Sequence, residues 1–398
     1  MSELILTLPN LPAGDIARDS VISRGEQRGD YRYIESLNDR LRGSLASEFL
    51  PRLPLTFHLL YAQDGREQAI ADDLMKLHNE PEARDDERGL IFAVEPNWNL
   101  SLCALPDGQP ATQPDHSAYL AQLGIARAQG KNNLGALGHI AVIDTGAEGV
   151  KIDDYYDLLS APLRPGVQNA IDDFGHGTAI ATLIREVAPD CKLSMIRVTD
   201  DDDIPLWYFM AGLGLAVLDA QAEIINLSLG IENMTGKCRW CGVSAYARAF
   251  ALENFMRFLK MGAKWFTGKE PPTFVAATGN DGSQNGFFIP ARWDVCLAVG
   301  SVNKSGHHSE FSTYGTLTHP YYVVAPGGET VNSVTTEFAI ADNKKPHLGT
   351  SISTAYASGV LALLRTDHPT GDLTQLALQR VTSASPPLLC GQGQIQYS

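Results

Sequence analysis

The chain has 398 residues, of which 44% are hydrophobic and 19% are charged, and its formal net charge is −15. This size and composition are typical of a globular protein that buries a sizeable core, with room for one large domain and a smaller one. The negative charge argues against binding to nucleic acids or anionic membranes, because both would repel the protein, and it mildly favours cationic substrates.

The first residues, MSELILTLPNLPAGD, lack the basic region and the apolar length of a signal peptide. No uncharged apolar stretch reaches about 18 residues, the length needed to span a membrane. The longest candidate, at 204–218, is stopped by Asp219 and predicts a buried helix. Six cysteines in a chain of this length do not suggest a disulfide framework. We therefore expect a soluble, cytoplasmic protein.

Residues 1–110 predict a small α+β domain. Apolar or alternating segments predict its strands, and a helical period predicts its helices. A stretch rich in Pro, Asp and Gln at 106–116 has turn and linker chemistry, so we place a linker and lead-in segment at 111–133. The expected strands lie at 53–62, 89–96 and 99–105, and the expected helices at 33–50 and 65–80.

From residue 134 to residue 398, continuous apolar segments alternate with helical ones. Strands of this kind are typical of a parallel sheet that is buried on both faces. We therefore expect an α/β domain with a mostly parallel sheet and helices on both faces, whose functional site lies beyond the carboxyl ends of the strands. An insertion rich in helix formers occupies about 231–272. The expected strands lie at 138–146, 193–198, 223–230, 273–280, 295–302 and 321–327.

Four polar residues stand at the ends of these elements. Asp144 ends the strand in IAVIDTG, and Asn280 ends the strand in FVAATGNDG. His176 and Ser351 follow glycine-containing turns at the starts of apolar helices, in GHGT and GTS. Each residue alone is more often an ordinary turn or cap residue. Together they stand at one predicted face of the sheet, and their joint coincidence is far less probable.

These four side chains fit nucleophilic catalysis at a carbonyl carbon. Ser351 would attack, and His176 would take the serine proton and later pass it to the leaving amine. Asp144, buried and ionised, would fix the imidazole tautomer and stabilise its protonated form. The side-chain amide of Asn280 and the backbone N–H of Ser351 would hold the oxyanion.

The order of acid, histidine, asparagine and serine resembles that of the subtilisin-like (S8) serine proteases. The motifs VIDTG, GHGT, NLSLG, AATGN, VVAPG and GTS occur in the family's order, and the resemblance covers roughly 120–395. It implies a subtilisin-like fold and a protein or peptide substrate. It also implies that the amino-terminal domain is propeptide-like: such a domain inhibits the enzyme and places its carboxyl tail in the substrate cleft. Residues 92–102 are similar to its final strand.

The resemblance also implies a set of substrate-binding residues. One group would form the edge that pairs with an extended peptide. The other would line the pocket for the side chain before the cleaved bond, and its small residues suggest an open, uncharged pocket. The first group is Ser228, Leu229 and Gly230, and the second is Ala276, Ala277 and Gly279.

The acidic run TDDDDIP at 199–205 falls near the family's second substrate-flanking strand. There, Asp201 and Asp202 would favour basic residues upstream of the cleaved bond. The alternatives are a solvated turn and a cation site. No metal or other cofactor is expected, because the helix that follows His176 lacks the inserted loop that binds calcium in many family members.

Two features depart from the family. Ala355 and Tyr356 stand where the family usually has proline and histidine, which leaves more room near Ser351 and keeps a ligase-like activity open. Cys238 and Cys241 have C-x-x-C spacing within the insertion. A second such pair is absent from the sequence, so zinc is weakly supported, and a redox-sensitive pair or a purely local role are the alternatives.

We therefore expect a serine endopeptidase that its own amino-terminal domain inhibits. The alternatives are a peptide ligase or macrocyclase of the same fold, and a catalytically silent scaffold that binds peptide strands. The sequence does not identify the physiological substrate or a regulatory partner.

Overall fold

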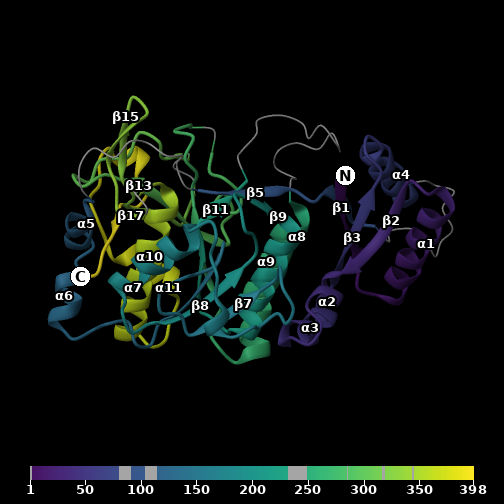
Figure 1. The fold of residues 1–398 in the computed structure, drawn as a ribbon, viewed down its shortest axis with the longest axis horizontal. Coiled ribbons are helices and arrows are strands. Elements are labelled where there is room, and N and C mark those ends of the chain that lie inside the picture. The colour runs from purple at the N-terminus through teal and green to yellow at the C-terminus, as the bar shows by residue number, and fades with distance from the viewer. Residues whose placement is uncertain are drawn as a thin grey trace.

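Two sheets organise the chain (Figure 1). The computed structural model describes residues 2–79, 91–103, 114–231, 249–284, 286–315, 319–342 and 345–398. A four-stranded antiparallel sheet lies near the N-terminus, and a nine-stranded, mainly parallel sheet forms the centre of the larger domain. Figure 1 shows the N-terminal sheet beside helices that cover one side of the larger domain.

The N-terminal domain is a sheet with apolar contacts on both faces. Its elements are β1 (Ser2–Pro9), α1 (Pro12–Arg28), β2 (Tyr31–Ser36), α2 (Leu37–Arg40), α3 (Leu45–Phe49), β3 (Leu55–Ala62), α4 (Glu67–Asn79) and β4 (Ala93–Pro96), with the strand order β2-β3-β1-β4. Leu4, Leu6 and Leu8 of β1 pack with residues of α1 and α4. Ile5, between them, joins the core of the larger domain. Successive side chains of a strand point to opposite faces, so β1 packs against the N-terminal helices on one face and against the larger domain on the other.

The prediction of a helix at 33–50 was wrong over its first residues. Residues 31–36 form β2, which pairs antiparallel with β3. Alternation of Tyr31 and Tyr33 suits a strand, and the pairing with β3 overrides the local helical character. Only two short helices, α2 and α3, follow. The predicted strand at 53–62 and the predicted helix at 65–80 are confirmed as β3 and α4.

The larger sheet has the order β19-β20-β14-β13-β12-β10-β6-β8-β7. Its strands are β6 (His139–Asp144), β7 (Asp154–Asp157), β8 (Lys192–Arg197), β10 (Ile224–Leu227), β12 (Thr273–Ala277), β13 (Cys296–Val302), β14 (Tyr322–Pro326), β19 (Val381–Thr382) and β20 (Gln394–Ile395). The six predicted apolar strands are all present, as β6, β8, β10, β12, β13 and β14. They run parallel, as the continuous apolar pattern indicated.

Helices cover both faces of this sheet, which confirms the predicted α/β class. Ile140 and Val142 of β6 pack in one cluster with α7 (His176–Val187) and α10 (Thr350–Asp367). Ala141 and Ile143 pack on the opposite face, in a cluster with α8 (Leu206–Gly214) and α9 (Phe250–Thr267). The remaining helices and hairpins lie outside these layers: α5 (His116–Gln122), α6 (Ile125–Gly130), α11 (Leu373–Gln379), β15 (Glu329–Val331), β16 (Val334–Glu337), β17 (Ile340–Asp342) and β18 (Lys345–His347).

The strands predicted at 89–96 and 99–105 are present as β4 and β5, whereas the strand predicted at 223–230 is divided. Residues 92–102 give β4 and then β5 (Asn99–Leu102), and 223–230 give β10 and then β11 (Leu229–Gly230). β5 leaves the N-terminal sheet and lies between β11 and β9 (Asp203–Pro205). The segment that was expected to be one final strand thus spans both domains.

Carboxylates cap helices across the domain boundary. Glu95 of β4 accepts hydrogen bonds from the backbone N–H groups of Phe250 and Ala251, at the start of α9, at 2.8 and 3.0 Å. Asp219, which follows α8, accepts from Leu45 and Ala46 at the start of α3, at 2.8 and 3.0 Å. Each carboxylate thereby satisfies N–H groups that have no partner within their own helix.

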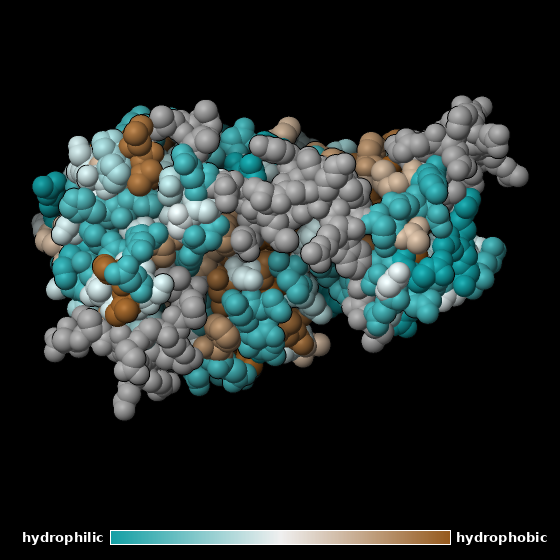
Figure 2. Space-filling model, turned by 90° about the horizontal axis from the view of Figure 1, so that it is seen from above, coloured by the Kyte–Doolittle hydropathy of each residue, from teal (hydrophilic) through white to brown (hydrophobic). Residues whose placement is uncertain are grey.

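The described part of the insertion at 231–272 consists mainly of α9, whereas Cys238 and Cys241 lie outside the described residues. No described helix is long and apolar enough to cross a membrane. Figure 2 shows that the described residues on one face of the molecule are mostly hydrophilic, with the hydrophobic ones in separate small patches.

Glu95 predicts a pH dependence of stability. Burial raises its pKa to about 7, although the two backbone N–H groups lower it. This pKa lies above the value of about 4.5 in the unfolded chain, so the folded protein binds the proton of Glu95 more tightly. The stability that this proton contributes is fully present below about pH 4.5 and is lost as the pH rises through about 7. Glu95→Gln should therefore flatten the pH dependence of the unfolding free energy by up to about 3 kcal/mol.

Urea unfolding of the two chains between pH 5 and pH 8 measures this difference. Glu26→Gln is the matched control, because Glu26 is an exposed glutamate of α1. Parallel pH curves for wild type and Glu95→Gln would contradict the prediction.

Candidate functional site

Asp144 and His176 meet where β6 ends and α7 begins. Asp144 Oδ1 and Oδ2 lie 2.8 and 3.0 Å from His176 Nδ1, and both side chains are buried. Nδ1 therefore donates to the carboxylate, which leaves Nε2 as the nitrogen that can accept a proton. This pairing needs the carboxyl end of a central strand to lie beside the first turn of a helix that packs on the sheet.

Asp172 and Thr145, which the sequence analysis did not single out, fix the start of α7. Asp172 accepts hydrogen bonds from the backbone N–H groups of Gly175 and Thr178, at 2.8 and 2.7 Å. Thr145 Oγ1 donates to Asp172 at 2.8 Å and accepts from the N–H of Gly177 at 2.9 Å. An acidic residue just before a helix start is a capping signal that the sequence contains.

The pKa of His176 is raised above its ordinary value of 6.5. Burial alone would lower it, but the charge of Asp144 and the hydrogen bond to Asp144 raise it, with further contributions from Asp172 and Asp202. The protonated imidazole is thus stabilised in a buried position, as a proton acceptor in catalysis requires.

Ser351 lies in the first turn of α10, and its Oγ is buried. Among the described residues, neither Ser351 Oγ nor His176 Nε2 has a hydrogen-bond partner. The bond between these two atoms is therefore not formed, although α7 and α10 pack against each other. Two buried, unpartnered atoms of this kind are costly, and they are typical of functional sites.

The orientation of the Asn280 amide is fixed by its neighbours. Its Oδ1 accepts from the backbone N–H and from Oγ1 of Thr350, both at 2.9 Å. Its Nδ2 must then face the other way, and it donates to the carbonyl oxygen of Cys103 at 2.6 Å. The backbone N–H of Ser351 donates to the same oxygen at 3.2 Å.

Gly349 leaves the space in which these groups meet. It has a φ of 133°, and a Cβ at this position would lie 2.6 Å from the Cys103 oxygen and 2.9 Å from Asn280 Nδ2. A side chain at this position would therefore displace the carbonyl group. The glycine of the GTS motif is required both by its backbone conformation and by this close approach.

β5 carries Cys103 into the site as an extended strand. It pairs antiparallel with β11, Leu102 opposite Leu229, and with β9, Leu100 opposite Ile204. The N–H of Cys103 donates to the carbonyl of Ser228 at 3.0 Å. A segment from the N-terminal part of the chain thus lies as an extended strand between two strand edges.

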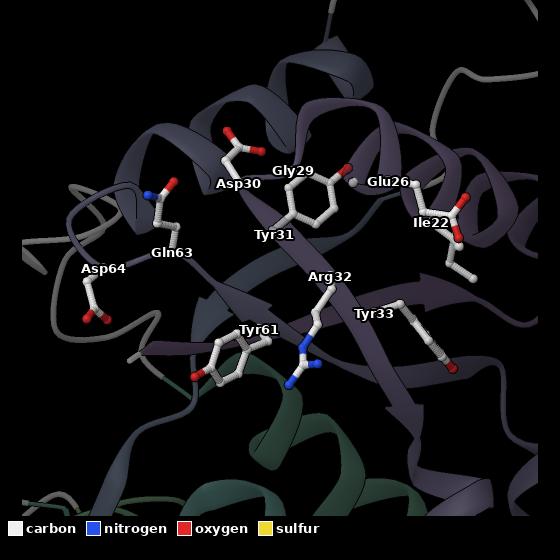
Figure 3. A pocket seen from close by; sticks show the side chains of 11 residues that line it. Ile22, Glu26, Gly29, Asp30, Tyr31, Arg32, Tyr33, Tyr61, Gln63 and Asp64 are labelled. Carbon is white, nitrogen blue, oxygen red and sulfur yellow. The ribbon is translucent and has the colours of Figure 1, made fainter.

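A large hollow lies apart from this site, on the N-terminal domain (Figure 3). It measures about 910 Å³ and is bounded by α1, β2 and β3. Arg32 lies over the ring of Tyr61 at its edge, 4.8 Å from the ring centre. Asp30, at the same hollow, is already paired with Arg28 and Arg66. This hollow contains none of the residues that surround the Cys103 carbonyl.

A sequence model described as the subtilase family matches residues 135–386, which is more than half of the chain. The chain belongs to the subtilase family. A thermophilic serine proteinase of Bacillus sp. (strain AK1) is 30% identical over 242 residues, which cover 56% of this chain and 51% of that protein. A thermostable alkaline protease of Halalkalibacterium halodurans is 29% identical over 67% of this chain and 69% of its own length. This subtilase is therefore a serine peptidase by family.

One solved structure shares the fold over both domains. The epidermin leader peptide processing serine protease of Staphylococcus aureus aligns with a TM-score of 0.65 and 19% identity. The alignment covers 100% of this chain and 97% of that one. The likeness in fold therefore includes the N-terminal domain as well as the larger one.

The structure places the predicted substrate-binding residues in different surroundings. Ser228, Leu229 and Gly230 contact β5 through their backbone. Ala276 and Ala277 are fully buried in β12. Gly279 donates its N–H to Thr350 Oγ1 at 3.2 Å and lies against Phe288, a residue that the sequence analysis missed. The open pocket expected beside Gly279 stays a prediction, and the structure adds that Phe288 lies against this glycine.

The two aspartates of the acidic run have separate roles. Asp201 Oδ1 accepts from Thr199 Oγ1 and from the N–H of Asp203, at 3.0 and 2.9 Å, and so holds a turn. Asp202 Oδ1 accepts from the backbone N–H of Leu102 at 3.0 Å. Asp201 thus holds a turn and Asp202 binds a backbone N–H, and the selection of basic side chains by these two residues stays a prediction. Among the described residues, no group of three or more His, Cys, Asp or Glu side chains could hold a metal.

The hydrogen bond from the Leu102 N–H to Asp202 predicts that cleavage depends on a backbone N–H at this position of a substrate. A peptide substrate that binds as residues 99–103 do places its second residue before the cleaved bond where Leu102 lies. A proline there has no N–H to donate to Asp202, so this carboxylate loses its partner. We expect kcat/KM to fall several-fold relative to leucine, since the lost hydrogen bond involves a charged group that is exposed to water. Asp202→Ala should reduce this ratio several-fold.

Cleavage of paired leucine and proline peptides measures the ratio. Asp200→Ala is the control, because Asp200 is an exposed neighbour that is absent from the contacts of Leu102. An equal ratio in wild type and Asp202→Ala would show that the contact does not operate on substrates.

Proposed function

We propose that this subtilase is a serine endopeptidase that is inhibited by its own segment 99–103 and that first cleaves its own chain after Cys103. The observation that carries the proposal is the position of the Cys103 carbonyl oxygen, which accepts from Asn280 Nδ2 and from the Ser351 N–H. Two N–H donors that converge on one carbonyl oxygen beside a serine are the arrangement that acyl transfer requires.

Catalysis would proceed in two steps. Ser351 Oγ attacks the carbonyl carbon of Cys103, and its proton passes to His176 Nε2. Negative charge then develops on the oxygen that the two N–H groups hold. When the C–N bond breaks, His176 gives the proton to the leaving amine, and a water molecule then hydrolyses the acyl-enzyme by the same route. Asp144 stabilises the imidazolium in both steps.

Inhibition follows from the same contacts. After cleavage, residues 99–103 would still pair with β9 and β11, and Glu95 would still cap α9. The product would therefore block the cleft until the N-terminal domain leaves. The wide contact of the two domains, which share one apolar cluster, makes this release slow.

The two alternative functions gain no specific support. Ala355 is buried within an uninterrupted α10, and the Tyr356 hydroxyl lies 2.9 Å from His116 Nδ1 of α5. Packing therefore accounts for both departures from the family pattern without a ligase activity. A silent scaffold would not need a buried Asp–His pair beside an unpartnered serine hydroxyl.

Self-cleavage tests the proposal directly. Wild type should release a fragment that ends at Cys103, detected by intact-mass analysis, and a fluorophosphonate should label Ser351. Ser351→Ala should lose the cleavage by more than about a thousandfold, because the nucleophile is removed. Ser353→Ala, a buried serine of the same helix, should cleave normally. Cleavage that survives in Ser351→Ala would refute the assignment.

The raised pKa of His176 predicts the pH profile. His176 must be neutral to accept the serine proton, so the cleavage rate should rise with pH through a midpoint above 6.5. The charge of Asp202 contributes to the raised pKa, so Asp202→Asn should move the midpoint to lower pH. Asp200→Asn is again the control. A midpoint below 6.5 in wild type would contradict the prediction.

A further inference from the structure

We propose that Phe288 restricts this subtilase to small side chains immediately before the cleaved bond. The inference rests on the proposed function, since it treats Cys103 as the residue whose carbonyl is attacked. It concerns the two backbone segments on either side of Cys103. One is β11, and the other is the turn from Thr278 to Asn280 that follows β12.

Both segments bind the backbone of Cys103. The carbonyl of Ser228, just before β11, accepts the Cys103 N–H at 3.0 Å. The side chain of Asn280, at the end of the turn, donates to the Cys103 carbonyl oxygen at 2.6 Å. The side chain before the cleaved bond therefore enters the space between β11 and this turn. Cys103 is small, and only 2% of its surface is exposed.

Phe288 is fixed to both segments by hydrogen bonds of the backbone. Its N–H donates to the carbonyl of Thr278 at 2.9 Å. The next residue, Ile289, forms a reciprocal pair with Ile231, directly after β11, with distances of 3.0 and 2.8 Å. The backbone of Phe288 is thus held between the two segments, β11 and the turn from Thr278 to Asn280, and this fixes where its side chain begins.

The side chain of Phe288 lies against the glycine of each wall. A Cβ on Gly279 would overlap with ring atoms of Phe288, and a Cβ on Gly230 would lie 2.9 Å from Phe288 Cβ. Both glycines are therefore needed to make room for this residue. Gly230 and Gly279 would leave space between them for a long substrate side chain, but the phenyl ring of Phe288 occupies this space. A leucine or phenylalanine would have to displace it, and forced overpacking of this kind is costly.

The self-cleavage reaction offers a test within the full chain. We expect Cys103→Phe to slow the release of the N-terminal fragment at least about tenfold, the effect of a modest overpacking penalty. Cys103→Ser, a small control, should cleave at nearly the wild-type rate. In the double variant Cys103→Phe/Phe288→Ala, the rate should return to within about threefold of Phe288→Ala alone, because the removed ring makes room for the new one.

A second measurement covers the case in which Cys103→Phe disturbs docking or folding. The processed enzyme is given peptides with the sequence Leu-Ser-Leu-X before the cleaved bond, with X as alanine, serine, leucine or phenylalanine. Wild type should favour alanine and serine over phenylalanine by at least about tenfold in kcat/KM. Phe288→Ala should reverse this order or remove it. The preference for leucine over proline at the second position before the bond should stay the same in both enzymes.

The outcomes separate the two proposals. If a fluorophosphonate labels Ser351 but wild type accepts phenylalanine as well as alanine, the role of Phe288 is refuted and the endopeptidase remains. An unchanged order of substrates in Phe288→Ala also refutes it. If Ser351 is not labelled and no chain is cleaved, the proposed function fails, and the role of Phe288 fails with it.

Discussion

The carbonyl oxygen of Cys103 connects the N-terminal part of the chain to the site, because two N–H groups of the larger domain donate to it. Asn280 comes from the turn after β12, and the Ser351 N–H comes from the first turn of α10, yet both donate to this oxygen. An N-terminus of a buried helix presents unpaired N–H groups and a partial positive charge, so it attracts such an oxygen. Gly349 permits the approach, because a side chain would fill the same space.

This arrangement has a cost that the surrounding core offsets. Ser351 Oγ and His176 Nε2 are buried and lack partners among the described residues. Each such group costs about 1–3 kcal/mol. The residues that hold them belong to rigid elements: α10 is buried along nearly its whole length, and Asp172 and Thr145 tie α7 to the end of β6. The scaffold, rather than their own hydrogen bonds, determines where these two atoms lie.

The sequence was informative wherever the chemistry required a particular residue at the end of an apolar strand. The strands that end near Asp144 and Asn280 are buried on both faces, and a continuous apolar segment is typical of such a strand, so the sequence identified them. Residues 31–36 were mispredicted because pairing with β3 decides their structure. Phe288 carries no polar group, and its effect depends on glycines that are distant in sequence, so no local pattern marks it. The contact of Asp202 with a backbone N–H could not be foreseen, because a carboxylate can bind an N–H as readily as a basic side chain.

A short connection links the site to the contacts between the two domains. Only the residues from Glu95 to Cys103 separate the cap on α9 from the site, and within them Asn97 accepts the N–H of Trp207, near the start of α8, at 2.8 Å. Most residues of this connection are bonded to α9, α8, β9 or β11, and Pro96 pairs with Leu4 of β1, so the position of the connection is closely fixed. The free edges of β9 and β11 each gain a partner only while β5 lies between them, and unpaired strand edges favour a replacement strand. The two edges that pair with residues 99–102 are therefore suited to pairing with an extended peptide.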